Sequence, residues 1–458
     1  MFDLIKKDTI CALATSFSPS AIAVIRISGF NSYKIKKNIF KPKNLKQRPF
    51  VATLGNVFCH KSGQIIDEAL CTFFPINKSY TGEESFELSI HGSPIIIEKI
   101  LEILIQSGAR LAQPGEFTLR AFLNGKLDLC AAESVNDIIY AKSIKASQIA
   151  LKILKGDLQK YLQYTRKILI EVLSEMEAKL DFPEDVFEGI DKYKILKNKL
   201  IKAKIMLNKL LQGANLGYRL FNSARVVLCG DVNVGKSTLL NALIGKDKAI
   251  VHESPGTTRD VLEANFEINN IPINLIDVAG IRDEDNLNPV EIIGINKAKI
   301  EFVKADIIIL IKDENFNDKK KHLKYINNII NNTSATILSV INKCDLFVLE
   351  ESFNDKLHII SAKTGHGIIE LKQRIYNILI GNTMDTCEIL LTKMRHKDEV
   401  KKSYSFIKIA LSNIDDKYND EIVVDELRQA ANCLDRLLGK DVNNDVLEEI
   451  FTRFCIGK

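Results

Sequence analysis

The sequence predicts a multidomain protein in which an N-terminal α+β region is followed by helical segments that an α/β region interrupts. The periodicity of apolar residues changes along the 458 residues, and these changes indicate this organisation. Short β-rich runs with Gly and Pro turns fill the first 120 residues or so, helical periodicity begins near Phe122, and apolar strands alternate with helical stretches between residues 224 and 380. We therefore expect an α+β domain at 1–120, a first helical part at 121–220, an α/β domain at 221–381 and a second helical part at 382–458.

The expected elements follow from apolar spacing. In the N-terminal region, strands are expected at Ala21–Ile27, Ala69–Phe74 and Phe86–Ile90, with a single helix at Ile95–Gln106. Apolar residues from Leu158 to Leu180 recur at steps of four and three, which places them on one face of a long helix that Pro183 must end. The same spacing returns at Val400–Leu411 and at Leu427–Leu438, where Gly439 is a candidate C-terminal cap.

Composition restricts the class of protein. Lys and Arg total 63 against 58 Asp and Glu, so any contact with nucleic acid must come from local patches. Nine scattered cysteines without a C-x-x-C pair argue against disulfides or a zinc site and for a reducing compartment. The N-terminal apolar run is too short for a signal peptide, and no later run is long enough to span a membrane. We expect a cytoplasmic protein with no membrane association.

A phosphate-binding motif lies at Gly230–Ser237, directly after the expected strand Ala224–Cys229 and before the helical run Thr238–Leu243. It fits G-x-x-x-x-G-K-[ST], in which backbone amides and a helix N-terminus meet phosphate charge. Lys236 is expected to reach the β- and γ-phosphates, and Ser237 to hold Mg²⁺. A chance Gly-rich turn is the alternative for this motif taken alone.

Three later motifs argue against chance. Asp277–Gly280, Asn342–Asp345 and Ser361–Lys363 each follow an expected strand, and the strands are Ile271–Ile276, Ala335–Ile341 and Leu357–Ile360, with a further strand at Asp306–Ile311. Asp277 would support Mg²⁺, and Asp345 would accept hydrogen bonds from the guanine edge. The α/β region is therefore predicted to be a Ras-like P-loop GTPase domain inserted into a helical domain. The residues expected to contact GTP are Asn233, Val234, Gly235, Lys236, Ser237, Thr238, His252, Glu253, Ser254, Pro255, Gly256, Thr257, Thr258, Asp277, Val278, Ala279, Gly280, Asn342, Lys343, Asp345, Ser361, Ala362 and Lys363.

Two positions narrow the expected mechanism. Ile281 stands where Ras-like enzymes carry the glutamine that orients the attacking water, so another group must hold that water. The amide oxygen of Asn233 is suited to a monovalent cation beside the phosphates, although Asn also stabilises turns. A candidate switch follows at His252–Asp260, in which Thr258 is a natural second ligand of Mg²⁺.

Several further signatures occur together in one known family. They are Gly256–Asp260 (G-T-T-R-D), Ala23–Gly29, Tyr80–Glu84, His91-Gly92, Pro114–Leu129, Leu180–Glu184 and the end Phe454–Lys458. On these residues the chain resembles the MnmE (TrmE) family of tRNA-modification GTPases over essentially its whole length. The resemblance implies a homodimer with an N-terminal folate-binding and dimerisation domain. It also implies an FAD-dependent GidA-type partner, with a heterotetramer as the assembly.

The family's activity and site residues are carried over by resemblance. It implies a potassium-activated GTPase that helps to install an aminomethyl-type (carboxymethylaminomethyl) group at C5 of the wobble uridine in certain tRNAs. The one-carbon donor would be 5,10-methylenetetrahydrofolate or 5-formyltetrahydrofolate, and FAD would come only with the partner. Glu291 would orient the attacking water. Potassium would contact Asn233, His252, Ser254 and Thr257, and folate would contact Arg26, Glu87, Lys126 and Lys458, with Cys455 lining the folate site.

Two other functions fit parts of the sequence. A ribosome-assembly or RNA-binding GTPase would share Gly230–Lys363 but has no need for Pro114–Leu129. A folate-dependent one-carbon transferase with regulatory GTP binding is the second alternative. The lysines of Asp191–Leu211 form a basic helix face that either contacts tRNA phosphates or is simply solvated.

Overall fold

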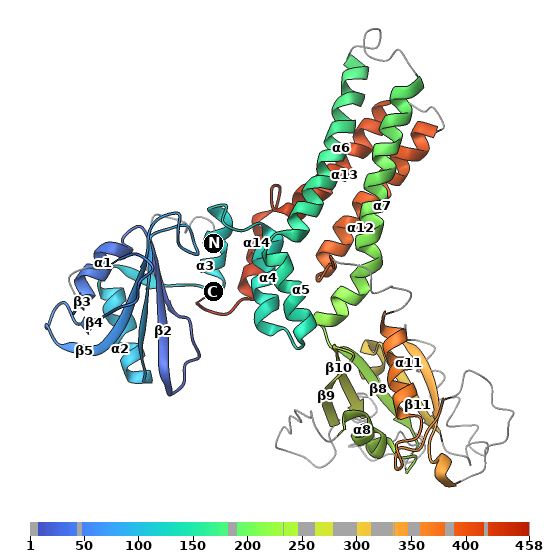
Figure 1. Cartoon of the computed structure of the whole chain (residues 1–458), viewed down its shortest axis with the longest axis horizontal. Helices are drawn as coiled ribbons and strands as arrows, with labels where there is room; N and C mark the ends of the chain where they lie inside the picture. The colour runs from blue at the N-terminus through green and yellow to red at the C-terminus, as the bar shows by residue number, and fades with distance from the viewer. Residues whose placement is uncertain are drawn as a thin grey trace. The chain divides into compact units, whose positions relative to one another are not determined.

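The computed structural model of the chain describes residues 8–43, 48–181, 190–231, 233–245, 262–277, 300–312, 333, 335–346, 358–380, 389–415 and 420–457 (Figure 1). The chain divides into two compact units. The first consists of Met1–Ile139, Ala150–Ile205 and Glu399–Lys458, and the second of Tyr140–Ile149 and Met206–Asp398.

The first unit begins with a seven-stranded sheet in the order β3-β4-β5-β6-β2-β1-β7. Neighbouring strands are antiparallel except for β1 and β7, which are parallel. The strands are β1 (Thr9–Leu13), β2 (Ser20–Gly29), β3 (Phe40–Pro42), β4 (Thr53–Phe58), β5 (Ile65–Phe74), β6 (Ser85–Gly92) and β7 (Ala109–Leu111). Alternate residues of β2 (Ala23, Ile25 and Ile27) are fully buried, so their neighbours Val24 and Arg26 point to the other face.

Two helices share the core of this sheet. They are α1 (Ser32–Ile39) and α2 (Pro94–Gln106), and their buried isoleucines and Leu104 belong to the same apolar cluster as Ile25 and Leu88. The sequence led us to expect only one helix in this region, and that was wrong. α1 is a short helix of eight residues with a polar, basic exposed side, so its four buried positions gave too weak a periodic signal.

The helical part of the first unit follows without a break. Its helices are α3 (Glu116–Leu123), α4 (Leu129–Tyr140), the end of α5 (Ile144–Leu154), α6 (Asp157–Asp181), the start of α7 (Ile190–Phe221), most of α12 (Met394–Asp415), α13 (Asp420–Leu438) and α14 (Asn444–Thr452). α6 packs along α13, where Arg166 forms two hydrogen bonds of 2.6 and 2.7 Å with Asp435. The predicted periodic face is confirmed as a buried face in α13, and in α6 as far as Met176, whereas Leu180 at the end of α6 is exposed. Gly439 ends α13 with a φ of +79°, a conformation that favours glycine at a helix end.

The second unit is built on a six-stranded sheet in the order β13-β12-β11-β8-β10-β9. All pairs are parallel except β9 with β10. The strands are β8 (Ala224–Gly230), β9 (Leu262–Ile268), β10 (Ile271–Asp277), β11 (Ile307–Lys312), β12 (Thr336–Ile341) and β13 (His358–Ile359), and the helices α8 (Lys236–Ile244) and α11 (Ile368–Ile380) pack on them. The predicted parallel α/β sheet is confirmed, and five expected strands lie within two residues of their observed bounds.

Some boundaries differ from the sequence-based expectation. The edge strand β9 was not expected, although its alternating buried residues Ala264, Phe266 and Ile268 are the usual strand signal. The expected boundary after residue 120 falls inside α3, and the one after residue 220 falls inside the last turn of α7. Within the described residues, no helix combines the length and the apolar character that crossing a membrane requires.

Candidate functional site

The four predicted nucleotide motifs each have described residues at one edge of the second unit's sheet. Gly230 and Asp277 are the last residues of β8 and β10, Asn342 directly follows β12, and Ser361 lies two residues after the end of β13. Because the carboxyl ends of parallel strands meet at the same edge of a sheet, these four residues lie along one edge. Ligands of open α/β sheets bind at this edge.

The loop after β8 has the backbone that a phosphate cradle needs. Asn233 and Gly235 have φ of +68° and +92°, and Gly235 is the N-cap of α8. A Cβ on Gly235 would lie 2.4 Å from Nδ2 of Asn342, so only glycine fits at this position. Asn tolerates a positive φ better than most residues, which explains Asn233 as a turn residue, and its side chain is exposed. The position of Asn233 is therefore compatible with both roles considered for it, which are contact with a monovalent cation and stabilisation of the turn.

Lys236, the first residue of α8, turns back over this loop. Its ammonium group donates to the carbonyl oxygens of Gly230 at 3.0 Å and Asp231 at 2.9 Å. Burial lowers the pKa of Lys236, and the nearby Asp277 carboxylate acts in the opposite direction. These two carbonyl groups hold the Lys236 ammonium group at the phosphate loop, where it is placed to contact an anionic ligand.

Ser237 and Asp277 join the loop to β10. The hydroxyl of Ser237 donates to Oδ2 of Asp277 at 3.1 Å, while the buried Oδ1 has no hydrogen-bond partner among the described residues. Burial raises the pKa of Asp277, although Lys236 and Ser237 oppose this. A hydroxyl beside a buried carboxylate oxygen that lacks a partner is a donor set that fits Mg²⁺, which prefers oxygen ligands.

Asn342 connects the phosphate loop with the last motif. Its Nδ2 donates to the carbonyl of Val234 at 2.8 Å, and its Oδ1 accepts from the backbone amide of Ala362 at 3.0 Å. The side chain is only 2% exposed, so this bridge is rigid. Lys343 follows with a φ of +69° and is partly exposed.

Asp345 stands at the solvent-exposed end of the same motif. Its Oδ1 accepts from the buried Ser361 hydroxyl at 2.6 Å, and that hydrogen bond holds the pKa of Asp345 below its usual range. Ala362 is buried and Lys363 is exposed beside it. The carboxylate is thereby oriented, and it keeps its second oxygen for a ligand.

The described residues leave part of the predicted site out. Val234 is buried under the loop, and Thr238 is exposed on α8. The expected catalytic Glu291, the potassium contacts His252, Ser254 and Thr257, and the terminal Lys458 lie outside the described residues. So do Glu253, Pro255, Gly256, Thr258, Val278, Ala279 and Gly280.

A second candidate site surrounds Arg26 in the first unit. Arg26 on β2 lies opposite Glu87 on β6, and its Nε donates to Glu87 Oε1 at 2.8 Å. Its Nη1 donates to the carbonyl of Gly457 at 3.3 Å, which brings the end of the chain to this strand. Both side chains of the pair stay partly accessible, at 20% and 29% exposure. The structure therefore brings Arg26 and Glu87 together, as the resemblance implies.

Two aromatic rings that the sequence did not mark as site residues flank this arginine. The guanidinium carbon lies 5.4 Å from the ring centre of Tyr80 and 5.7 Å from that of Phe117. The hydroxyl of Tyr80 is hydrogen-bonded to Thr118 Oγ1 at 2.9 Å, and burial raises its pKa. Such rings hold a guanidinium by cation–π attraction and leave its edge for an anionic partner. The only sequence signal was that Tyr80 and Phe117 lie within two of the shared signatures.

Lys126 joins the same part of the unit through the Tyr80–Glu84 loop. Its ammonium donates to the carbonyl of Asn77 at 2.6 Å, and a Cβ on Gly82 would lie 3.2 Å from its Cε. The neighbouring Asn124 side chain donates to the carbonyl of Thr81 at 2.7 Å. Lys126 is exposed, so its remaining hydrogens are free to meet a ligand.

A buried ionic network fixes this loop to α3. Arg120, which is 1% exposed, donates to Glu83 at 3.1 Å, to Glu116 at 2.8 Å and to Asp8 at 2.6 Å. Arg110 shares Glu116, with a distance of 2.6 Å. Burial alone would raise the pKa of Glu116, but hydrogen bonds from Arg110, a backbone amide and Arg120 outweigh it and lower that pKa. The network holds the Tyr80–Glu84 loop and α3, which carry the two rings beside Arg26.

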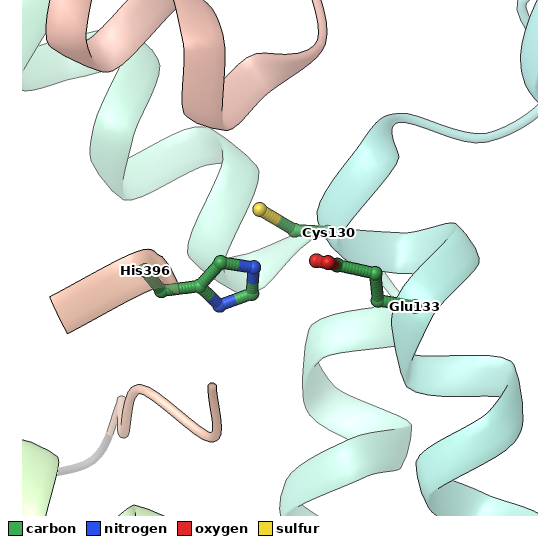
Figure 2. Close-up of side chains that lie close together, drawn as sticks. All are labelled: Cys130, Glu133 and His396. Atoms are coloured by element: carbon green, nitrogen blue, oxygen red, sulfur yellow. The ribbon is translucent and has the colours of Figure 1, made fainter. Parts of the chain in front are cut away.

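Two buried polar side chains of α4 do not contribute to either site. Figure 2 shows Cys130 and Glu133 one turn apart on this helix. The thiol of Cys130 donates to the carbonyl of Leu437 in α13 at 3.3 Å, which makes it a packing residue of the helical part. His396, also drawn in Figure 2, belongs to the second unit, so we build no ligand set from the three.

A phosphate loop, a magnesium-type aspartate and an N-K-x-D motif at the same edge of a mainly parallel sheet define the class of P-loop GTPases. Comparison with known protein families identifies the family of this chain. Residues 9–126 match the family model "GTP-binding protein TrmE N-terminus", and residues 129–455 match the "MnmE helical domain". The chain belongs to the MnmE family, and it is a GTPase.

Full-length relatives agree with this assignment. The tRNA modification GTPase MnmE of Thermotoga sp. (strain RQ2) is 37% identical over 459 residues, which cover 98% of this chain and 100% of the relative. That of Aquifex aeolicus (strain VF5) is 35% identical over 458 residues, 99% and 100% of the two chains. Among solved structures, the G domain of the T. maritima FeoB iron transporter matches 34% of this chain and 99% of its own, with 27% identity and a TM-score of 0.28.

Proposed function

We propose that this chain is a potassium-activated GTPase of tRNA modification in the cytoplasm. It works as a homodimer with an FAD-dependent GidA-type protein, in a heterotetramer. Together they install a carboxymethylaminomethyl-type group at C5 of the wobble uridine, with a tetrahydrofolate as one-carbon donor. The relatives, which are tRNA modification GTPases, support the role in tRNA modification, and the resemblance supports the partner and the folate.

The observation that carries the nucleotide chemistry is the Ser237–Asp277 pair beside Lys236. Ser237 and the unpartnered Oδ1 of Asp277 would hold Mg²⁺, which neutralises phosphate charge when it is bound. Lys236 exchanges its two loop carbonyls for the phosphates. Because it is already held at the loop, little ordering is required when GTP binds.

Asn342 and Asp345 select guanine over adenine. Asn342 holds the phosphate loop and the Ser361–Lys363 motif in one rigid arrangement. Asp345, oriented by Ser361, accepts two hydrogen bonds from the guanine edge, which adenine cannot donate. The backbone of Ser361–Lys363 contacts the guanine oxygen.

Hydrolysis depends on Asn233 in the phosphate loop, on the switch His252–Asp260 and on Glu291. Asn233 is exposed at the fourth position of the phosphate loop, and its amide oxygen would contact potassium there. His252, Ser254 and Thr257 complete the potassium contacts, Thr258 is the second magnesium ligand, and Glu291 orients the attacking water. Potassium then supplies the positive charge that an arginine finger supplies in other GTPases.

The folate site is formed by Arg26, Glu87, Lys126 and Lys458. Arg26 and Lys126 suit folate carboxylates, and Glu87 suits the N–H groups of the pterin. Tyr80 and Phe117 fix the guanidinium, and the carbonyl of Gly457 ties the chain end to it. Cys455 lines the site.

The test is GTP turnover in potassium and sodium buffers of equal ionic strength. We expect turnover to be at least roughly tenfold faster in potassium, because the cation compensates charge that develops in the transition state. Asn233→Ala should remove the potassium effect, and Glu291→Ala should abolish turnover in both buffers. Arg374→Ala, an exposed residue of α11, is the matched control. Equal rates in the two salts would refute potassium activation while leaving the GTPase assignment intact.

A further inference from the structure

A cavity of about 700 Å³ lies in the helical part of the first unit, and Lys126 is the one residue of the two sites described above that lines it. It forms where the turn between α3 and α4, the turn after α5 and the turn between α13 and α14 meet. Leu154, Leu438 and Leu447 are among its apolar lining residues. None of its lining residues belongs to the nucleotide motifs, so its side chains need another explanation.

Each of the three turns brings one lysine to this cavity next to a glycine. The pairs are Gly125-Lys126, Lys155-Gly156 and Gly439-Lys440, and their glycines have φ of +67°, +86° and +79°. All three lysines are exposed. A Cβ on Gly125 would meet nothing within 4 Å, so the chain leaves open space at this part of the rim.

A second hollow of about 480 Å³ extends this surface along α6. The two share Lys440, and α6 adds Arg166 and the exposed Lys167. We call the two hollows together the basic groove. The two hollows have Lys440 in common, so the basic groove includes residues from the end of α3 to α6, a longer span than a pocket for one small molecule needs.

The charge of the basic groove is positive. The acidic side chains among its lining residues, Asp128 and Glu171, are both engaged elsewhere. Asp128 accepts from the backbone amide of Ala131 at 3.0 Å, and Glu171 pairs with Lys199 at 3.1 Å. Lys440 lies 3.6 Å from Asp435, whose two oxygens are already bound to Arg166, so that pairing is weak. Lysine ammonium groups spaced along a groove suit successive phosphates of a polyanion.

We propose that the basic groove binds the phosphodiester backbone of RNA and is the surface on which this chain holds its tRNA. This rests on the proposed function, which supplies tRNA as the substrate. Sequence-independent phosphate contacts position a nucleic acid without reading its bases. The lysines of the groove therefore fix where the tRNA lies, and its sequence is read elsewhere.

The experiment measures binding of a labelled tRNA transcript to the full-length protein by fluorescence anisotropy over a series of KCl concentrations. The variants are Lys155→Glu, Lys440→Glu and the double variant. At low salt the double variant should bind roughly tenfold or more weakly. The slope of log K against log salt should become shallower by about one for each phosphate that a lysine no longer neutralises. Lys34→Glu, an exposed residue of α1, makes the same charge change away from the groove and should bind like the wild type.

Three results would overturn the proposal. Unchanged affinity and slope in the double variant would show that the groove is not the tRNA surface, and the proposed function would stand. A lower melting temperature with unchanged RNA affinity would mean that these lysines only complement helix C-termini. A wild-type protein that does not bind tRNA would also sink the RNA part of the proposed function.

Discussion

The nucleotide site and the Arg26 site are built from chain segments in different ways. At the nucleotide site, each motif is a short continuous stretch that ends a strand, and the parallel sheet brings the ends together. At the Arg26 site, three partners from distant parts of the chain meet, because Glu87 is 61 residues away from Arg26 and Gly457 is 431 away. The first site depends on one sheet, whereas the second depends on the chain end reaching the N-terminal sheet.

This difference predicts how each site fails. Within the nucleotide site, Asn342 and Ser361 hold neighbouring loops through hydrogen bonds of 2.6 to 3.0 Å, so one side chain can be changed while the others keep their places. At the Arg26 site, one guanidinium holds Glu87, a terminal carbonyl and two rings at once. Removing it disturbs several contacts together, which is the usual result in a coupled network.

The largest expected effect is a change of base preference at Asp345. In Asp345→Asn, the side chain gains an N–H donor in place of one acceptor, so guanine loses one of its two hydrogen bonds and its amino group meets another donor, whereas the oxygen that xanthine carries at that position can accept from the new N–H. We expect GTP turnover at low nucleotide concentration to fall by roughly 100-fold or more, and turnover of xanthosine triphosphate to rise. Turnover of both nucleotides, measured side by side, checks this. Loss of both activities would show that Asp345 also supports the fold through Ser361.

Most strands and motifs of the second unit could be predicted from the sequence, because the residues that mark each of them are close together in the chain. The residue types of the phosphate loop and of N-K-C-D are required by local backbone geometry, as the positive φ of Gly235 and the bridging role of Asn342 show. The unexpected strand β9 has a clear alternation, but an edge strand next to the switch segment has no motif to mark it. The fold class is therefore confirmed, while the roles of individual site residues stay predictions.

The Arg26 site was accessible only through resemblance. Nothing in the spacing of Arg26, Glu87 and Gly457 indicates that they touch, because register between strands and the path of the chain end are tertiary properties. The buried position of Arg120 could likewise not be predicted from the sequence, since a charged residue in the middle of a helix usually faces solvent. Its guanidinium can be buried because it forms ion pairs with the carboxylates of Asp8, Glu83 and Glu116.

The second prediction tests the Arg26 site directly. Arg26→Ala removes the charge-assisted hydrogen bonds to a folate carboxylate and leaves Tyr80 and Phe117 without the cation between them. We expect the affinity for 5-formyltetrahydrofolate to fall by roughly 10- to 100-fold, measured by isothermal titration calorimetry. Arg48→Ala, an exposed arginine of the same unit, is the control. Equal affinity in Arg26→Ala and the wild type would contradict the proposed folate site.

The smallest expected effect concerns the acid stability of the network around Arg120. Because the pKa of Glu116 is held below its ordinary value of 4.5, its contribution to stability is fully present above that pH. It is lost as the pH falls through the lower pKa of the folded state. Asp8, whose ordinary value is 3.8, behaves in the same way, because its hydrogen bonds with Arg120 and Arg110 outweigh the opposing effect of burial.

Glu116→Gln should therefore lower the free energy of unfolding by about 1–3 kcal/mol at pH 7, since Arg120 stays buried with one carboxylate fewer. The difference from the wild type should shrink as the pH falls below about 4.5. Urea unfolding at pH 7 and near pH 4, followed by a probe in the first unit, measures both values. Glu102→Gln, which removes an exposed partner of Lys99 on α2, should be nearly neutral at either pH. A difference for Glu116→Gln that does not change with pH would mean that packing rather than charge dominates at this position. The ionic network would then not be what holds the Tyr80–Glu84 loop against α3.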